Sequence, residues 1–170
     1  MGFSADHRGN VYALYRSARE LVHRDVYLLA SADEGRSYRG TLLSPRQTSS
    51  CPMSSMAFAE GPSGVIAAWE TAGDVRFARV AAEGPSASPA VGPPGEAQSR
   101  KHPRLAVNGA GQILLVWTEG TSWARGGSLA WRVFGPDSRA LAARGERADL
   151  PAWSFGAAVA QADGTFTVFY

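Results

Sequence analysis

The sequence predicts an all-β fold of the β-propeller type, with three complete four-stranded blades and the first half of a fourth. Three observations predict it. A unit of about 50 residues recurs along the chain. The 19 glycines and 10 prolines interrupt the chain too often for long helices. The second strand of each unit is apolar on both of its sides, as in a strand that is covered by neighbouring sheets.

Four segments share the same pattern, a short apolar strand, a polar turn with glycine and a second strand that closes on an aromatic residue. They are residues 3–16, 56–70, 105–119 and 157–170. The turn glycines are 55, 47 and 53 residues apart, and they are Gly9, Gly64, Gly111 and Gly164. The closing aromatic residues are 54, 48 and 53 apart, and they are Tyr15, Trp69, Trp117 and Tyr170. This period fits four strands of about 5 to 6 residues with their turns, which is one blade.

The repeat divides a single partial propeller domain, residues 1–170, into units. The predicted blades are residues 1–46, 54–98 and 102–149, followed by a half blade at 153–170. Their outermost strands are expected near residues 38–43, 88–92 and 141–144. A β-sandwich also uses short alternating strands, but the equal spacing of corresponding residues favours the propeller.

The half blade predicts exposed strand edges. The chain is therefore expected to be part of a roughly six-bladed ring, or to assemble with copies of itself through those edges. Expressed alone, it is expected to aggregate or oligomerise.

One turn in the first blade carries a motif suited to a tight hairpin, S-A-D-E-G-R-S-Y at residues 31–38. An Asp in a hairpin accepts backbone N–H bonds, glycine adopts the conformations that the turn needs, and an aromatic ring can pack under it. Asp33 is therefore predicted to support the fold rather than to act as a catalytic acid. The predicted structural set is Ser31, Asp33, Gly35, Ser37 and Tyr38.

The octapeptide resembles the Asp-box, S-x-D-x-G-x-[ST]-[WY], of bacterial neuraminidase (BNR) repeats, with every defined position filled. Residues 24–29 and 51–53 are also similar to segments of uncharacterised bacterial exo-sialidase-like proteins. The resemblance implies a propeller of the sialidase type, with the boxes on the face opposite the active site.

The resemblance also implies a set of catalytic residues, namely an arginine triad, a tyrosine nucleophile paired with a glutamate, and an acid/base aspartate. The early arginine motif of that family, F/Y-R-I-P, is absent from this sequence. Tyr12, Tyr15 and Tyr27 lie in apolar strands and are predicted to be core residues. The catalytic residues therefore stay unknown.

If the Asp-box turns mark one face, a ligand site is expected on the opposite face. That face is formed by residues 16–25, 47–55, 70–74, 98–102 and 119–127. Arginine can bind a carboxylate through two hydrogen bonds and tryptophan can stack on a sugar, although charged side chains are common in any surface loop. The ligand-binding candidates are Arg16, Arg24, Asp25, Glu70, Arg100, His102, Glu119, Trp123 and Arg125.

Several partner classes are not expected. The 17 basic and 15 acidic residues are interspersed, which argues against binding to nucleic acid or to a membrane surface. Cys51 is the only cysteine and the three histidines lack metal-ligand spacing, so no metal site is expected. No phosphate-binding or dinucleotide-binding motif is present, so no cofactor is expected. The compartment stays unknown, and a secreted or periplasmic location would require a signal peptide upstream.

These observations lead to three functional hypotheses. The first is a catalytically incomplete, sialidase-like propeller module that binds a glycan or another small polar ligand. The second is an exo-α-sialidase, a glycoside hydrolase, whose remaining catalytic residues lie outside this chain. The third is a structural interaction scaffold.

Overall fold

The computed structural model describes residues 1–170 except 21, 50–54, 82–85 and 98. The described residues form thirteen strands in four antiparallel sheets, and they contain no helix. Within them, no helix is long and apolar enough to cross a membrane. Cys51 and the segment 51–53 lie outside the described residues. The chain is therefore all-β, as predicted.

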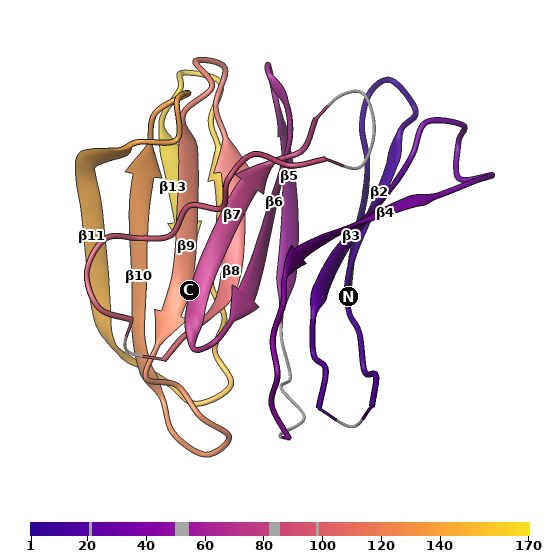
Figure 1. The fold of residues 1–170 in the computed structure, drawn as a ribbon. Coiled ribbons are helices and arrows are strands. Elements are labelled where there is room, and N and C mark those ends of the chain that lie inside the picture. The colour runs from indigo at the N-terminus through magenta and orange to yellow at the C-terminus, as the bar shows by residue number, and fades with distance from the viewer. Residues whose placement is uncertain (21, 50–54, 82–85, 98) are drawn as a thin grey trace.

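The strands of each sheet follow one another in chain order (Figure 1). The first sheet contains β1 (Gly2–Ala5), β2 (Val11–Arg16), β3 (Val26–Ser31) and β4 (Arg39–Ser44). The second contains β5 (Met56–Gly61), β6 (Gly64–Thr71) and β7 (Asp74–Arg79). The third contains β8 (Arg100–Val107), β9 (Ile113–Glu119), β10 (Gly127–Phe134) and β11 (Ala140–Leu150), and the fourth contains β12 (Ala157–Ala160) and β13 (Phe166–Phe169).

The sheets bury their flat faces against one another in sequence, as the blades of a propeller do (Figure 1). Tyr12 and Leu14 of the first sheet share a core with Trp69 of the second. A second core joins the second and third sheets, and a third joins the third and fourth. The burial of β6 and β9 along nearly their whole length follows from this stacking.

Three of the four closing aromatic residues of the repeat face the preceding sheet. Trp69 faces the first sheet, and Trp117 faces the second. The ring of Tyr170 lies 5.9 Å from the guanidinium of Arg147, on the third sheet. Tyr15 of the first sheet instead stacks on Tyr27 of the same sheet, with ring centroids 5.4 Å apart. The shared orientation supports the repeat that the spacing predicted.

The second sheet differs from the prediction, because residues 88–92 do not form a regular fourth strand. Val91 exchanges two backbone hydrogen bonds of 2.8 Å with Phe77, and the Ser88 N–H donates to the Arg79 carbonyl at 2.9 Å. The three residue steps from Ser88 to Val91 therefore pair with only two residue steps, from Phe77 to Arg79, on β7. Pro89 lies between the two contacts and has no N–H to donate, so the pairing is interrupted by a bulge. The other outer strands, β4 and β11, are regular, and β11 is longer than expected.

The turn of residues 31–38 has the hydrogen bonds that its chemistry predicts. The carboxylate of Asp33 accepts the Ser31 hydroxyl at 2.6 Å, and the Ser37 N–H and hydroxyl at 2.8 and 2.6 Å. Gly35 has a φ of 85°, in the left-handed region that favours glycine. These hydrogen bonds lower the pKa of Asp33 to about 2. The ring of Tyr38 was expected to pack under the turn, but it packs only in part, because 46% of the Tyr38 surface remains exposed.

Strand direction alternates within each sheet, so the connections fall at two ends. The β1–β2, β3–β4, β8–β9 and β10–β11 turns lie at one end. The other end, called here the loop face, carries residues 17–20, 22–25, 45–49, 72–73, 92–97, 120–126 and 151–156. The ligand candidates therefore lie in or beside one set of connections.

Candidate functional site

A pocket of about 150 Å³ lies on the loop face between the third and fourth sheets. We call it the aromatic pocket, and it is lined by Lys101, His102, Thr121, Ser122, Trp123, Trp153, Ser154 and Phe155. Its residues come from the start of β8 and from the connections that follow β9 and β11. Of the predicted candidates, it contains His102 and Trp123.

Local backbone geometry presents the two tryptophans. Trp123 stands at the tip of a turn that closes where the Ser122 N–H donates to the Arg125 carbonyl at 3.0 Å. Gly126 then passes so close to the Leu150 backbone that a Cβ atom would collide with it, and this approach brings the two loops together. The indoles meet edge to face, with centroids 4.5 Å apart and planes at 80°. They keep 70% and 57% of their surface exposed.

Two residues that line the pocket have strained backbones. Trp153 has a φ of 68° and His102 a φ of 54°, a region that costs a side-chain-bearing residue energy. Both residues carry a ring that lines the pocket. The imidazole of His102 packs edge-on against Phe155, with centroids 4.8 Å apart. Backbone strain of this kind often accompanies a binding site.

Hydrogen bonds fix the polar side of the pocket. The His102 Nδ1 atom lies 2.9 Å from the Thr118 hydroxyl, and the Lys101 ammonium donates to the Thr121 carbonyl at 2.9 Å. Burial lowers the pKa of His102, and the positive charges of Lys101 and Arg104 lower it further. The neutral imidazole is therefore favoured.

Glu70 lies near the aromatic pocket and is almost fully buried at the end of β6. It accepts a hydrogen bond from the His102 backbone N–H, while its Oε2 atom has no hydrogen-bond partner. Burial raises the pKa of Glu70, and the positive charges of Lys101, Arg16 and Arg46 partly oppose that rise. This carboxyl group is held more readily in its neutral form than an exposed one.

Three other candidates meet where the first and second sheets adjoin. The Arg16 guanidinium donates to the carbonyl oxygens of Arg24 and Glu70, so it ties the two sheets together. The carboxylate of Asp25 is buried and accepts the Arg46 N–H at 2.8 Å. Arg24 donates to the His23 carbonyl at 3.0 Å. All of these contacts hold the connections of the first sheet in place.

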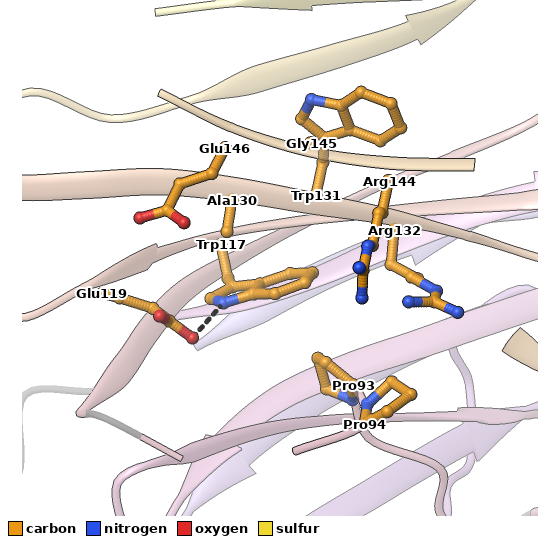
Figure 2. Close-up of a pocket in the computed structure, with 10 residues that line it drawn as sticks. All are labelled: Pro93, Pro94, Trp117, Glu119, Ala130, Trp131, Arg132, Arg144, Gly145 and Glu146. Carbon is orange, nitrogen blue, oxygen red and sulfur yellow. Dashed lines mark hydrogen bonds between the residues drawn. The ribbon is translucent and has the colours of Figure 1, made fainter. Parts of the chain in front are cut away.

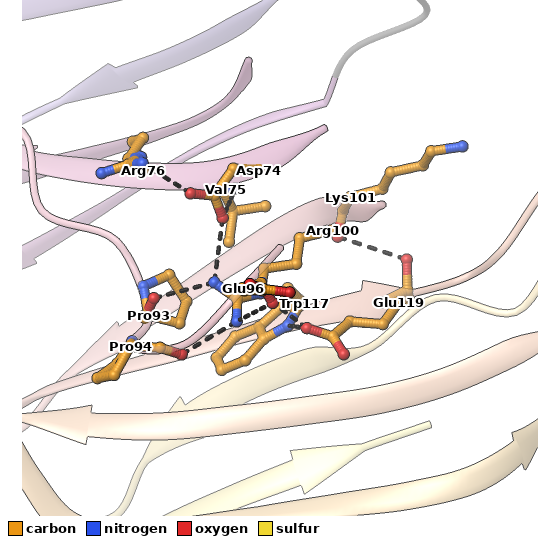
Figure 3. Close-up of polar contacts among 11 residues, drawn as sticks. Asp74, Val75, Arg76, Pro93, Pro94, Glu96, Arg100, Lys101, Trp117 and Glu119 are labelled. Atoms are coloured by element: carbon orange, nitrogen blue, oxygen red, sulfur yellow. Dashed lines mark hydrogen bonds and ion pairs between the residues drawn. The ribbon is translucent and has the colours of Figure 1, made fainter. Parts of the chain in front are cut away.

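Arg100 is not a loop residue, contrary to the prediction, because it begins β8 and is 5% exposed. Its guanidinium has five N–H donors, and all five are used within the chain (Figure 3). The partners are Glu119 at 2.7 Å, Asp74 at 3.2 Å, and the carbonyl oxygens of Pro93, Pro94 and Glu96 at 2.9 to 3.1 Å. No donor is left for a ligand, so the geometry argues for a structural role. Glu119 is engaged in the same contacts.

Arg125 lies in the same turn as Trp123 but folds back to donate to the Gly120 carbonyl at 3.1 Å. Two aromatic pocket residues, Trp153 and Phe155, were not among the candidates, although two aromatic residues in a short connection were a usable signal. Arg46 was also not among the candidates, because the sequence does not reveal that its positive charge acts on Glu70. No cluster of metal-ligating side chains occurs among the described residues.

Comparisons with known proteins identify the fold. No protein-family model matches the chain, and no curated protein matches it significantly. Among solved structures, it is similar to a Penicillium chrysogenum α-L-arabinanase complexed with arabinobiose, with a TM-score of 0.55 and 14% sequence identity. The match covers 94% of this chain and 52% of the arabinanase chain, so this chain spans about half the length of that protein. The fold and the similarity define a β-propeller.

Proposed function

We propose that this chain is a carbohydrate-binding β-propeller module whose ligand occupies the aromatic pocket. The observation that carries the proposal is the pair of exposed indoles, Trp123 and Trp153, beside a lysine and a histidine. Large exposed aromatic surfaces are costly in water, whereas the C–H faces of a sugar can cover them. The arabinanase that resembles this chain was solved with a bound sugar, which supports the same class of ligand.

The cation favours a sugar that carries a carboxylate. The Lys101 ammonium has three donors and uses one on the Thr121 carbonyl. A carboxylate near this group would gain a charge-assisted hydrogen bond. The resemblance of residues 31–38 to an Asp-box also points to sialic acid, which has both a carboxylate and an apolar ring face.

A glycan array that contains sialosides and neutral glycans, followed by calorimetry, tests this proposal. Trp123→Ala and Trp153→Ala should each weaken binding about tenfold, a loss of about 1.4 kcal/mol, because each removes one stacking surface. Phe3→Ala is the matched control, since Phe3 is 68% exposed but lies on the first sheet, away from the pocket. An array without hits, or equal losses in all three variants, would contradict the proposal and favour a structural scaffold.

An exo-sialidase is the second candidate, and Glu70 is the observation that favours it. A glycosidase needs a carboxyl group that keeps its proton near neutral pH, and burial shifts Glu70 in that direction. Turnover of a fluorogenic sialoside by the wild type, lost in Glu70→Gln while the melting temperature is kept, would support this candidate. Binding without turnover would support the non-catalytic module.

A further inference from the structure

A second and larger pocket, of about 420 Å³, lies between the third sheet and the segment that follows the bulged edge of the second, and it shares no lining residue with the aromatic pocket (Figure 2). We call it the rim pocket. Its walls come from β10 and β11 on one side and from Pro93 and Pro94 on the other. It lies between the second and third sheets of this chain.

Two arginines stand together in the rim pocket without a negative partner. Arg132 and Arg144 are directly opposite each other across the β10–β11 ladder, so their side chains share one face of the sheet. Figure 2 shows both guanidinium groups pointing toward the two prolines. Among the described residues, neither makes a hydrogen bond or an ion pair, and the Arg132 Nε atom is buried without a partner. Like charges in opposite positions repel, and a buried unpaired donor is costly.

The opposite wall of the rim pocket is rigid. The prolines have fixed φ angles, and the Arg100 guanidinium holds both of their carbonyl groups at 2.9 and 3.0 Å. The indole of Trp117 forms the surface between the walls, and its Nε1–H donates to Glu119 at 2.9 Å (Figure 2). A ligand would therefore meet a preformed site and would not have to order it.

The charges are separated within the rim pocket. The arginines stand at one end, and Glu119 and Glu146 stand at the other (Figure 2). Such an arrangement suits a small molecule with one oxyanion and neutral hydrogen-bond donors, and it repels a ligand that is anionic along its whole length. The volume is large enough for a ligand about the size of a monosaccharide.

We propose that the rim pocket binds a small organic oxyanion, with its carboxylate or phosphate between Arg132 and Arg144 and its neutral end toward Glu146. The anion relieves the repulsion between the two guanidinium groups and supplies the acceptor that Arg132 Nε lacks. This site is independent of the carbohydrate site proposed on the loop face.

Nuclear magnetic resonance on the ¹⁵N-labelled 170-residue chain tests this proposal. The probes are glucuronate, inorganic phosphate and glucose, at constant ionic strength. Glucuronate and phosphate should shift the Arg132 Nε–H and Trp117 Nε1–H signals, whereas glucose should not. Tighter binding of glucuronate would indicate a carboxylated sugar, and tighter binding of phosphate would indicate a phosphorylated ligand. Both anions should raise the melting temperature, because they bind the folded state.

Arg132→Gln and Arg144→Gln should each weaken binding of the anion about tenfold, through loss of a charge-assisted bond. Arg139→Gln is the control, because Arg139 is exposed in the β10–β11 turn beside Asp137. Trp123→Ala should leave the anion site unchanged, which separates this test from that of the carbohydrate site. Absence of the arginine shift, an equal shift with glucose, or an equal loss in Arg139→Gln would overturn the proposal.

Discussion

Two arginine sites lie on the same interface between the second and third sheets, and their surroundings are opposite. Arg100 is buried and has an acceptor for each of its donors. Arg132 lies further out, beside another arginine, and has a buried donor without a partner. An arginine is thus available to a ligand when the fold leaves its donors free, whatever its place in the sequence.

The largest expected effect contrasts these two residues through the same substitution. Arg100→Met should lower the free energy of unfolding by about 3–5 kcal/mol, because it removes five hydrogen bonds from partly buried carboxylates and carbonyl groups. Arg132→Met should change it by less than about 1 kcal/mol, because no internal bond is lost and a repulsion is removed. Denaturant titration followed by tryptophan fluorescence measures both. Similar losses in the two variants would contradict the comparison.

A second prediction extends the comparison to Glu70, a buried carboxyl group with one unpaired oxygen. Its folded-state pKa is raised by burial, so the folded chain binds a proton that the unfolded chain has already released. Glu70 therefore makes the free energy of unfolding fall as pH rises from its ordinary pKa of 4.5 through the raised value. Melting temperatures across this range should fall less in Glu70→Gln than in the wild type.

The control for Glu70 is Glu20→Gln, because the Glu20 side chain is 81% exposed. This variant should keep the pH profile of the wild type. If Glu70→Gln followed the same profile as the control, burial of the Glu70 carboxyl group would not affect its titration.

The smallest effect is expected at Asp33, whose partly buried carboxylate is hydrogen-bonded within its turn. Its folded pKa of about 2 is below the ordinary value of 3.8, so its contribution to stability is present above that value and is lost as pH falls toward 2. Asp33→Asn should flatten this acid limb of the melting curve. An unchanged acid limb would mean that the turn is formed without the charge.

The sequence could predict features that repeat or that are local. The period predicted equivalent positions for Trp69 and Trp117, and residues 31–38 predicted their own hydrogen bonds. Trp123 was expected in a connection of the loop face, and it lies there with most of its surface exposed. Local patterns are sufficient for these inferences, since each depends on neighbours in the chain.

Features that depend on distant partners could not be predicted. The donors of Arg100 are used by residues up to 26 positions away, and the meeting of Trp123 with Trp153 depends on a close backbone approach at Gly126. The bulge at residues 88–92 was not predicted, although the sequence contains a local signal for it. Pro89 is visible in the sequence, and its missing N–H predicts an irregular strand there.

That bulge also affects how the molecule meets copies of itself. A regular outer strand offers an unbroken row of donors and acceptors on which a foreign strand can grow into a fibril. On the second sheet this row is interrupted at Pro89, so a foreign strand would lose its alignment after a few residues. Pro89 therefore opposes fibril growth along the outer edge of the second sheet.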